Sequence, residues 1–273
     1  MMRYTIRYVS LLAGMLTVFS SCEHKDLCFD HEAHAPKSDV HVKAVYEKEW
    51  EHTCEGGPDW EQYPAWESRF GMEYHELCPD APDGLRVQVY NEDGTNNILN
   101  VAPEGDIVRM RPGEHSLLLY NNDTEYIVFD DMNSFASAKA TTRTRTRASY
   151  AGNPYMENTV ENTVNAPDML YGNYMENYTA ERKIEADELP VTMHPLVFTY
   201  LVRYEFSHGL EYVALARGAL AGMAGAVWLN SGRTSEEAAT ILYDCSVEDF
   251  GTQACVCLLY TSPSPRDRQK ARM

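Results

Sequence analysis

The segment Leu85-Arg-Val-Gln-Val-Tyr90, followed by Asn91-Glu-Asp-Gly94 and then by Asn97-Ile-Leu-Asn-Val101, decides the fold class. Its first part alternates apolar and polar residues with a period of two, which is typical of a β-strand with one buried face. The second part starts a chain reversal with Asn and Asp, and its Gly accepts a positive φ angle. The third part returns as a partner strand, so the segment predicts a β-hairpin.

Short segments of the same character flank this hairpin about every ten residues, a spacing that favours a β-sandwich over a parallel sheet with helices between its strands. They are Val40–Tyr46, Ile107–Arg111, Glu114–Tyr120 and Tyr126–Phe129. Pro112 and Gly113 mark a further turn between two of them. We therefore expect a first β-sandwich domain over residues 40–135.

Residues 136–188 have a different character. They are polar, and Tyr155-Met-Glu-Asn-Thr159 is weakly repeated by Tyr174-Met-Glu-Asn-Tyr178, too briefly for a solenoid. This composition predicts an irregular loop or linker. The run Arg143-Thr-Arg-Thr-Arg147 within it leaves three interpretations open: a site for a trypsin-like protease, a contact for an acidic partner, or an exposed inter-strand loop, which is favoured.

Strand-like sequence resumes at Leu189 and predicts a second β-sandwich over residues 189–256. Its strongest segments are Val191–Met193, Pro195–Phe206 and Ala239–Cys245. The apolar stretch 212–229 resembles a membrane helix in length, but Arg217 would be costly in a bilayer. We expect two strands there, Glu211–Arg217 and Ala224–Leu229, joined by a Gly-rich bend, with a short helix as the alternative.

Both ends of the chain differ from its middle. Residues 1–21 combine two Arg, a short apolar run and small residues before Cys22, in the order of a lipoprotein signal peptide. We expect Cys22 to be acylated and to hold the protein on the outer membrane, exposed at the cell surface, with residues 22–39 as a tether. An ordinary signal peptide with an incidental Cys22 is the alternative.

The last 17 residues, 257–273, turn basic in an otherwise acidic chain. They resemble the translation of a sequencing adapter, so we expect an artefactual tail and a second sandwich truncated before it. A natural basic tail is the alternative.

The remaining candidate site residues are cysteines and aromatic residues. Cys54 and Cys78 bracket a loop rich in Gly, Pro and Trp, and export to an oxidising compartment would allow a disulfide between them. Four aromatic residues in and before this loop could stack on sugar rings, although packing inside the protein is the commoner role. They are Trp50, Trp60, Tyr63 and Trp66.

Composition and motifs also limit the function. The chain has 23 Lys and Arg against 41 Asp and Glu, a net charge of −18 that argues against nucleic acid as a partner. It contains no Gly-x-Ser-x-Gly elbow, no His-Glu-x-x-His motif and no phosphate-binding loop. The cluster of His24, Cys28, Asp30, His31 and His34 matches no zinc-ligand pattern with paired Cys-x-x-Cys, and a flexible tether is the favoured interpretation. We therefore expect a non-enzymatic protein with no catalytic residues, no metal and no cofactor.

Several longer stretches resemble a Bacteroidota lipoprotein family of uncharacterised function that is related to the anchor subunits of type V fimbriae. They are Ser21–His31, Arg111–Asn121, Asp168–Gly172 and Gly209–Gly225. The resemblance implies an all-β fold of two tandem transthyretin-like or immunoglobulin-like sandwiches on a lipid anchor. It also implies a fimbrial anchor or accessory protein that docks partner subunits through sheet edges. A surface lipoprotein that binds glycans through the Trp-rich loop 50–66 is the alternative function.

Overall fold

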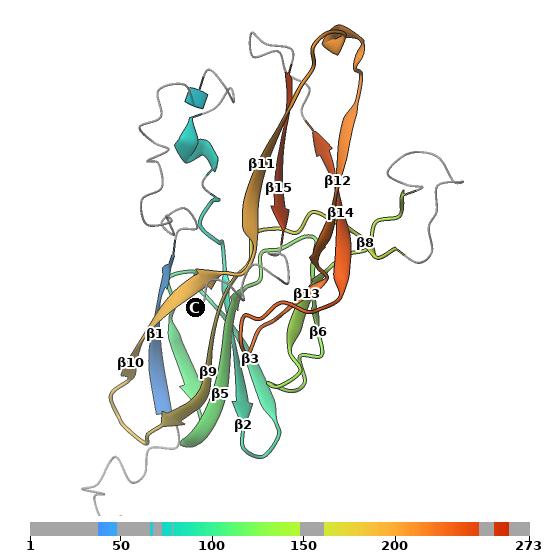
Figure 1. Cartoon of the computed structure of the whole chain (residues 1–273). Coiled ribbons are helices and arrows are strands. Elements are labelled where there is room, and N and C mark those ends of the chain that lie inside the picture. Colours follow the sequence, from blue (N-terminus) through green and yellow to red (C-terminus); the bar gives the residue numbers. More distant parts are fainter. Residues whose placement is uncertain are drawn as a thin grey trace, which may run out of the picture. The chain divides into compact units, whose positions relative to one another are not determined.

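Strands carry nearly all the regular structure in this computed structural model (Figure 1). The structure describes residues 38–47, 66–67, 73–77, 79–147 and 161–245, and the backbone of 254–261. Short 3-10 turns lie at Tyr74–Leu77 and Leu210–Tyr212. The all-β prediction is confirmed. The strands are β1 (Ser38–Tyr46), β2 (Leu85–Asn91), β3 (Asn96–Val101), β4 (Ile107–Met110), β5 (Gly113–Asn121), β6 (Ile127–Asp130), β7 (Lys139–Thr142), β8 (Thr163–Asn165), β9 (Tyr171–Ala180), β10 (Asp187–Pro195), β11 (Phe198–Glu205), β12 (Ala216–Ala224), β13 (Ala226–Trp228), β14 (Ala238–Cys245) and β15 (Ala254–Thr261).

The main sheet has seven strands in the order β3-β2-β5-β9-β10-β1-β4. The pairing of β1 with β10 is parallel, and every other pairing in this sheet is antiparallel. The predicted hairpin is its β2–β3 pair, in which Leu85 lies opposite Val101 and Tyr90 opposite Asn96. The period-two pattern of this segment therefore predicted the correct strands and the correct pairing.

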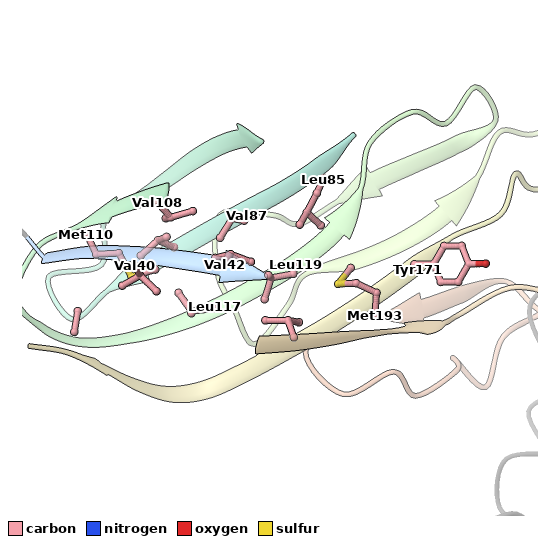
Figure 2. Close-up of a cluster of buried hydrophobic side chains, with 13 residues drawn as sticks. Val40, Val42, Leu85, Val87, Val108, Met110, Leu117, Leu119, Tyr171 and Met193 are labelled. Carbon is pink, nitrogen blue, oxygen red and sulfur yellow. The ribbon is translucent and has the colours of Figure 1, made fainter. Parts of the chain in front are cut away.

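The main sheet encloses a core to which both of its ends contribute. Buried residues of β1 and β4 pack in the same cluster as buried residues of β2, β5, β9 and β10. Figure 2 shows Val40 and Val108 from one part of the sheet and Val87 and Leu117 from another directed into one interior. Alternate residues of these strands are apolar, so one face of each strand is removed from water. The sheet thus folds over itself as a sandwich does.

Strand β5 is buried on both of its faces. Leu117 and Leu119 belong to the core inside the main sheet. Leu118 and Tyr120 point the other way and pack against Ile127 and other residues of the three-stranded sheet β13-β7-β6 and its loops. This explains why four consecutive large apolar residues occur here without a polar residue between them.

A smaller core supports the remaining strands. The small sheet has the order β12-β14-β8, and β11 pairs with β15. Val202 of β11 packs against the buried cluster of the small sheet, and the Tyr204 and Tyr243 hydroxyls lie 3.0 Å apart. The buried members of this cluster are Val164, Met223, Ala239, Ile241 and Tyr243.

Residues 136–188 are not the irregular segment that their composition indicates. They contain β7, β8 and β9, and β9 is a ten-residue strand between β5 and β10 in the main sheet. Glu176 and Asn177 lie on exposed positions, whereas Tyr171, Gly172 and Ala180 are buried. Neighbours on both sides therefore support a strand whose own sequence is mixed, with Tyr and Thr that favour strands and Gly, Asn and Glu that do not. Since β10 begins at Asp187 and pairs with β1, the predicted boundary at residue 188 falls inside a strand.

The apolar stretch 212–229 forms strands, as expected, but not with the expected bounds. The Gly-rich segment itself is strand β12, and a 3-10 turn occupies Leu210–Tyr212 where a strand was predicted. Gly218 has a packing role in β12, because the absence of a Cβ lets the buried Tyr243 ring lie against the strand backbone. In the part of the chain that the structure describes, no helix has the length and hydropathy needed to cross a membrane.

Candidate functional site

The outermost strands of each sheet are the candidate docking sites, because an edge strand presents backbone groups that can pair with another chain. Strand β3 is one edge of the main sheet. Its sequence, Asn-Asn-Ile-Leu-Asn-Val, contains no charge and no Pro, and its register with β2 runs without interruption. Ile98 in its middle is 53% exposed. This strand lacks the charges, Pro residues and bulges that usually protect an edge.

The opposite edge of the main sheet, β4, is shorter and charged. It has four residues, and its Arg109 lies 3.7 Å from the Asp39 carboxylate of β1. The loop before it continues along β1, where Val42 N–H donates to the Asp106 carbonyl and Ala44 N–H to the Glu104 carbonyl. A short strand with a charged side chain is a poor template for a further strand.

The small sheet has a different kind of protection on each edge. On β12, the register with β14 shifts between Leu220 and Met223, and Gly222 there has a φ angle of 81°. The edge of β8 is covered by the Arg run, residues 143–147. Arg145 N–H donates to the Thr163 carbonyl, and Thr144 forms a bridge with Val164. A bulge and a covering segment are both common ways of closing an edge.

The Arg run is held by acids of its own chain. Arg145 lies 3.1 Å from Asp244, and Arg147 binds both carboxylate oxygens of Glu161 at 2.6 and 2.7 Å. Thr240 also donates to Glu161, and these bonds, that of Arg147 first, lower the pKa of Glu161 to about 2. The favoured interpretation as an exposed loop therefore fits Arg143, whereas Arg145 and Arg147 are partly buried and paired. Cleavage of the run by a protease stays a prediction.

Most of the site residues predicted from the sequence lie outside the described residues: Cys22, Cys54, Cys78, Trp50, Trp60 and Tyr63. Acylation of Cys22 and the disulfide of Cys54 with Cys78 therefore stay predictions. Trp66 is described, and its ring meets Tyr74 edge to face with centroids 5.0 Å apart. Cys245 is disulfide-bonded.

Within the described ranges, no group of three or more His, Cys, Asp or Glu side chains is arranged to hold a metal ion. Sequence reasoning did not single out β3, and its uncharged composition is no signal alone, because residues 116–122 of the same chain are uncharged as well.

Comparison with known proteins places the chain in a family. Residues 65–244 match the model of a family described as "Domain of unknown function (DUF5119)". The chain belongs to the DUF5119 family. The DUF5119 region includes β2 and β3 but not β1, although β1 contributes Val40 and Val42 to the core of the main sheet.

A relative of this DUF5119 chain is described as "Putative fimbrium anchoring subunit Fim4B" of Bacteroides ovatus. The two are 27% identical over 178 residues, which cover 63% of this chain and 50% of the relative. The chain thus spans about half the length of the curated relative that it matches. The resemblance to a family related to fimbrial anchors is confirmed.

Solved structures support the fold of the DUF5119 chain. A protein described as a "putative adhesin" from Bacteroides ovatus superposes with a TM-score of 0.59 at 22% identity, over 90% of this chain and 72% of that one. The fimbrial anchor protein Mfa2 from Porphyromonas gingivalis gives a TM-score of 0.46 at 10% identity, over 83% of this chain and 73% of that one, and nothing is inferred from it. The first likeness shows that the β-sandwich architecture also occurs in a known structure.

Proposed function

We propose that this chain is an outer-membrane lipoprotein of the fimbrial anchor or accessory type, which docks partner subunits at the cell surface through a free sheet edge. The proposal combines two findings. A relative named as a fimbrium anchoring subunit shares 27% identity with it, and an uncharged edge strand lies at one side of its main sheet.

The edge strand β3 is the observation that carries the proposal. A strand that pairs on one side only presents a row of backbone N–H and C=O groups to water. These groups can instead form hydrogen bonds with the backbone of another polypeptide. Addition of a strand from a second protein uses main-chain hydrogen bonds for affinity and alternate side chains for specificity. This mode needs no catalytic residue, in agreement with a role in assembly.

The membrane side of the proposal rests on the sequence around Cys22. An acylated Cys22 would hold the protein by acyl chains, each buried CH₂ contributing about 0.8 kcal/mol, without a membrane-spanning segment. Metabolic labelling with radioactive palmitate tests this step. We expect label in the wild-type chain and in Cys28→Ala, the matched control, and none in Cys22→Ala. Equal labelling of Cys22→Ala would overturn the lipoprotein assignment.

The docking role is tested by co-purification from cells that make fimbriae. The Cys22→Ala chain, released from the membrane, should bring fimbrial subunits with it when it is purified under native conditions. Recovery of the chain without any fimbrial subunit would contradict the role. Binding to a glycan array that is lost in Trp60→Ala and Trp66→Ala would instead favour the glycan-binding alternative.

A further inference from the structure

The register of β2 and β3 determines which backbone groups of β3 face away from the sheet. Asn91 N–H donates to the Thr95 carbonyl at 2.8 Å, so this pair is a hydrogen-bonded one. Hydrogen-bonded pairs alternate along an antiparallel ladder. The next ones are therefore Val89 with Asn97 and Val87 with Leu99, in agreement with the observed register. The N–H and C=O groups of the residues between them must point outward.

Three residues thus offer their backbone groups at the free side of β3: Asn96, Ile98 and Asn100. Among the described residues no strand pairs with them on that side (Figure 1). Asn100 is fixed by its side chain, whose Oδ1 accepts hydrogen bonds from Arg86 and Asn122.

Packing holds β3 in the conformation that a partner strand would need. Leu99 and Val101 pack against the core inside the main sheet, on the face opposite to Ile98. A strand that is already extended and anchored loses little conformational entropy when a second strand pairs with it. The edge is therefore a preformed template and not a segment that has to order first.

Charge defines what kind of segment fits this template. The strand itself is uncharged, but an exposed acid stands near each of its ends: Glu92 in the turn before it and Glu104 in the loop after it. Asp93, next to Glu92, is already paired with Arg111 at 3.1 Å. A partner segment with an uncharged centre and a basic residue near each end matches this pattern, since opposite charges across an interface favour docking and select the partner. A second copy of this chain fits poorly, because each copy has a net charge of −18.

We propose that β3 binds an extended segment of a partner subunit as an added strand, that the segment is uncharged in its centre, and that it carries Lys or Arg at both ends. This rests on the proposed function, because it names the edge and the partner chemistry for the same docking role. The apolar side chain that Ile98 exposes would lie beside an apolar side chain of the partner.

A synthetic peptide tests the chemistry directly. The probe is an acetylated and amidated peptide of alternating Thr and Val with one Lys at each end, added to the purified full chain. Amide hydrogen exchange should slow by at least about tenfold at Ile98, whose N–H points outward, and stay unchanged at Leu99, whose N–H already bonds to β2. The same peptide with Glu in place of Lys should bind about tenfold more weakly.

Substitution of Ile98 separates pairing from folding. Ile98→Pro removes an outward N–H that donates to no other strand, so the sheet should persist while peptide protection is lost. Ile98→Thr keeps the N–H and should retain binding. Equal binding by Ile98→Pro, protection at Leu99 in place of Ile98, or a dimer of the chain that Ile98→Pro dissolves would each overturn the inference.

The two proposals fail in different ways. If the peptide protects Ile98 but no fimbrial subunit co-purifies, the edge assignment holds and the fimbrial role fails. If subunits co-purify equally well with the wild-type chain and with Ile98→Pro, the role holds and the edge assignment fails.

Discussion

The main sheet and the small sheet stabilise themselves by different means. The main sheet buries apolar side chains on both faces of β5, in two clusters that together include residues of most of its strands. The small sheet has a cluster of five buried residues and adds charged pairs between the Arg run, β12 and β14. Apolar burial therefore stabilises the main sheet above all else. Ion pairs occur in both sheets, but Arg145 and Arg217 in the small sheet are less exposed than Lys43 in the main sheet, and the Arg run also keeps the edge of β8 covered.

The largest expected effect is on the main sheet. Leu117→Ala removes a fully buried side chain next to other buried residues and should lower the free energy of unfolding by about 3 kcal/mol. Urea denaturation followed by circular dichroism measures it. Val45→Ala, at a position of β1 that is 66% exposed, is the matched control and should change stability by no more than about 0.5 kcal/mol. Similar losses in the two variants would contradict the assignment of β5 as the centre of the core.

The next effect concerns packing in the small sheet. A methyl group at Gly218 would overlap the ring of Tyr243, which is buried and whose hydroxyl is held by Tyr204. Gly218→Ala should therefore cost about 2 kcal/mol. In the double variant Gly218→Ala with Tyr243→Leu the methyl group has room. Its loss in free energy of unfolding should therefore be smaller than the sum of the losses of the two single variants. Strict additivity in thermal unfolding would show that the ring does not pack on this glycine.

The next smaller effect is the pH dependence of stability, which should differ between the ion pairs of the two sheets. The low pKa of Glu161 means that its contribution to stability is complete above its usual value of 4.5 and is lost as the pH falls toward about 2. Glu161→Gln should cost about 1 kcal/mol at neutral pH and flatten the pH dependence over that window. Thermal unfolding at several pH values measures both.

The control for this prediction is Glu188→Gln in the main sheet, where Glu188 pairs with Lys43 at the surface. Because both side chains are about half exposed or more, this change should be the smaller of the two. A larger acid sensitivity at Glu188 would reverse the comparison between the sheets.

The smallest effect belongs to Asp244. Its carboxylate serves both Arg145, at 3.1 Å, and Arg217, at 2.9 Å, but it is 52% exposed. Asp244→Asn should lower the free energy of unfolding by less than about 1 kcal/mol, and the difference should vanish in about 1 M salt, which screens exposed charges. A loss that persists unchanged in salt would mean that the pair acts through packing.

The sequence allowed the local part of the fold to be predicted. The hairpin of β2 and β3 and strand β1 follow from period-two patterns and turn residues, and strand β5 follows from its apolar run after the Pro112-Gly113 turn. These signals lie within about ten residues of one another, so they need no information about distant contacts.

The rest depends on contacts between distant residues. Strand β9 was missed because its neighbours, and not its own Asn and Glu side chains, make it a strand. The pairing of Arg145 with Asp244 could not be identified, since the two residues lie 99 positions apart in the chain. The uncharged composition of β3 is visible in the sequence, but its position at an edge follows only from the strand order.

The parallel pairing of β1 with β10 has a consequence for how the protein folds. Lys43 and Glu188, which meet across this pair, are 145 residues apart in the chain. Closing so long a loop has an entropic cost that local contacts cannot offset in advance, so pairings of this kind form late. Strand β1 must therefore wait for β10, one of its two neighbours, while most of the sheet is made. During that interval its unpaired side is open to association with other chains. We therefore expect chaperones that act at this stage to raise the yield of folded protein.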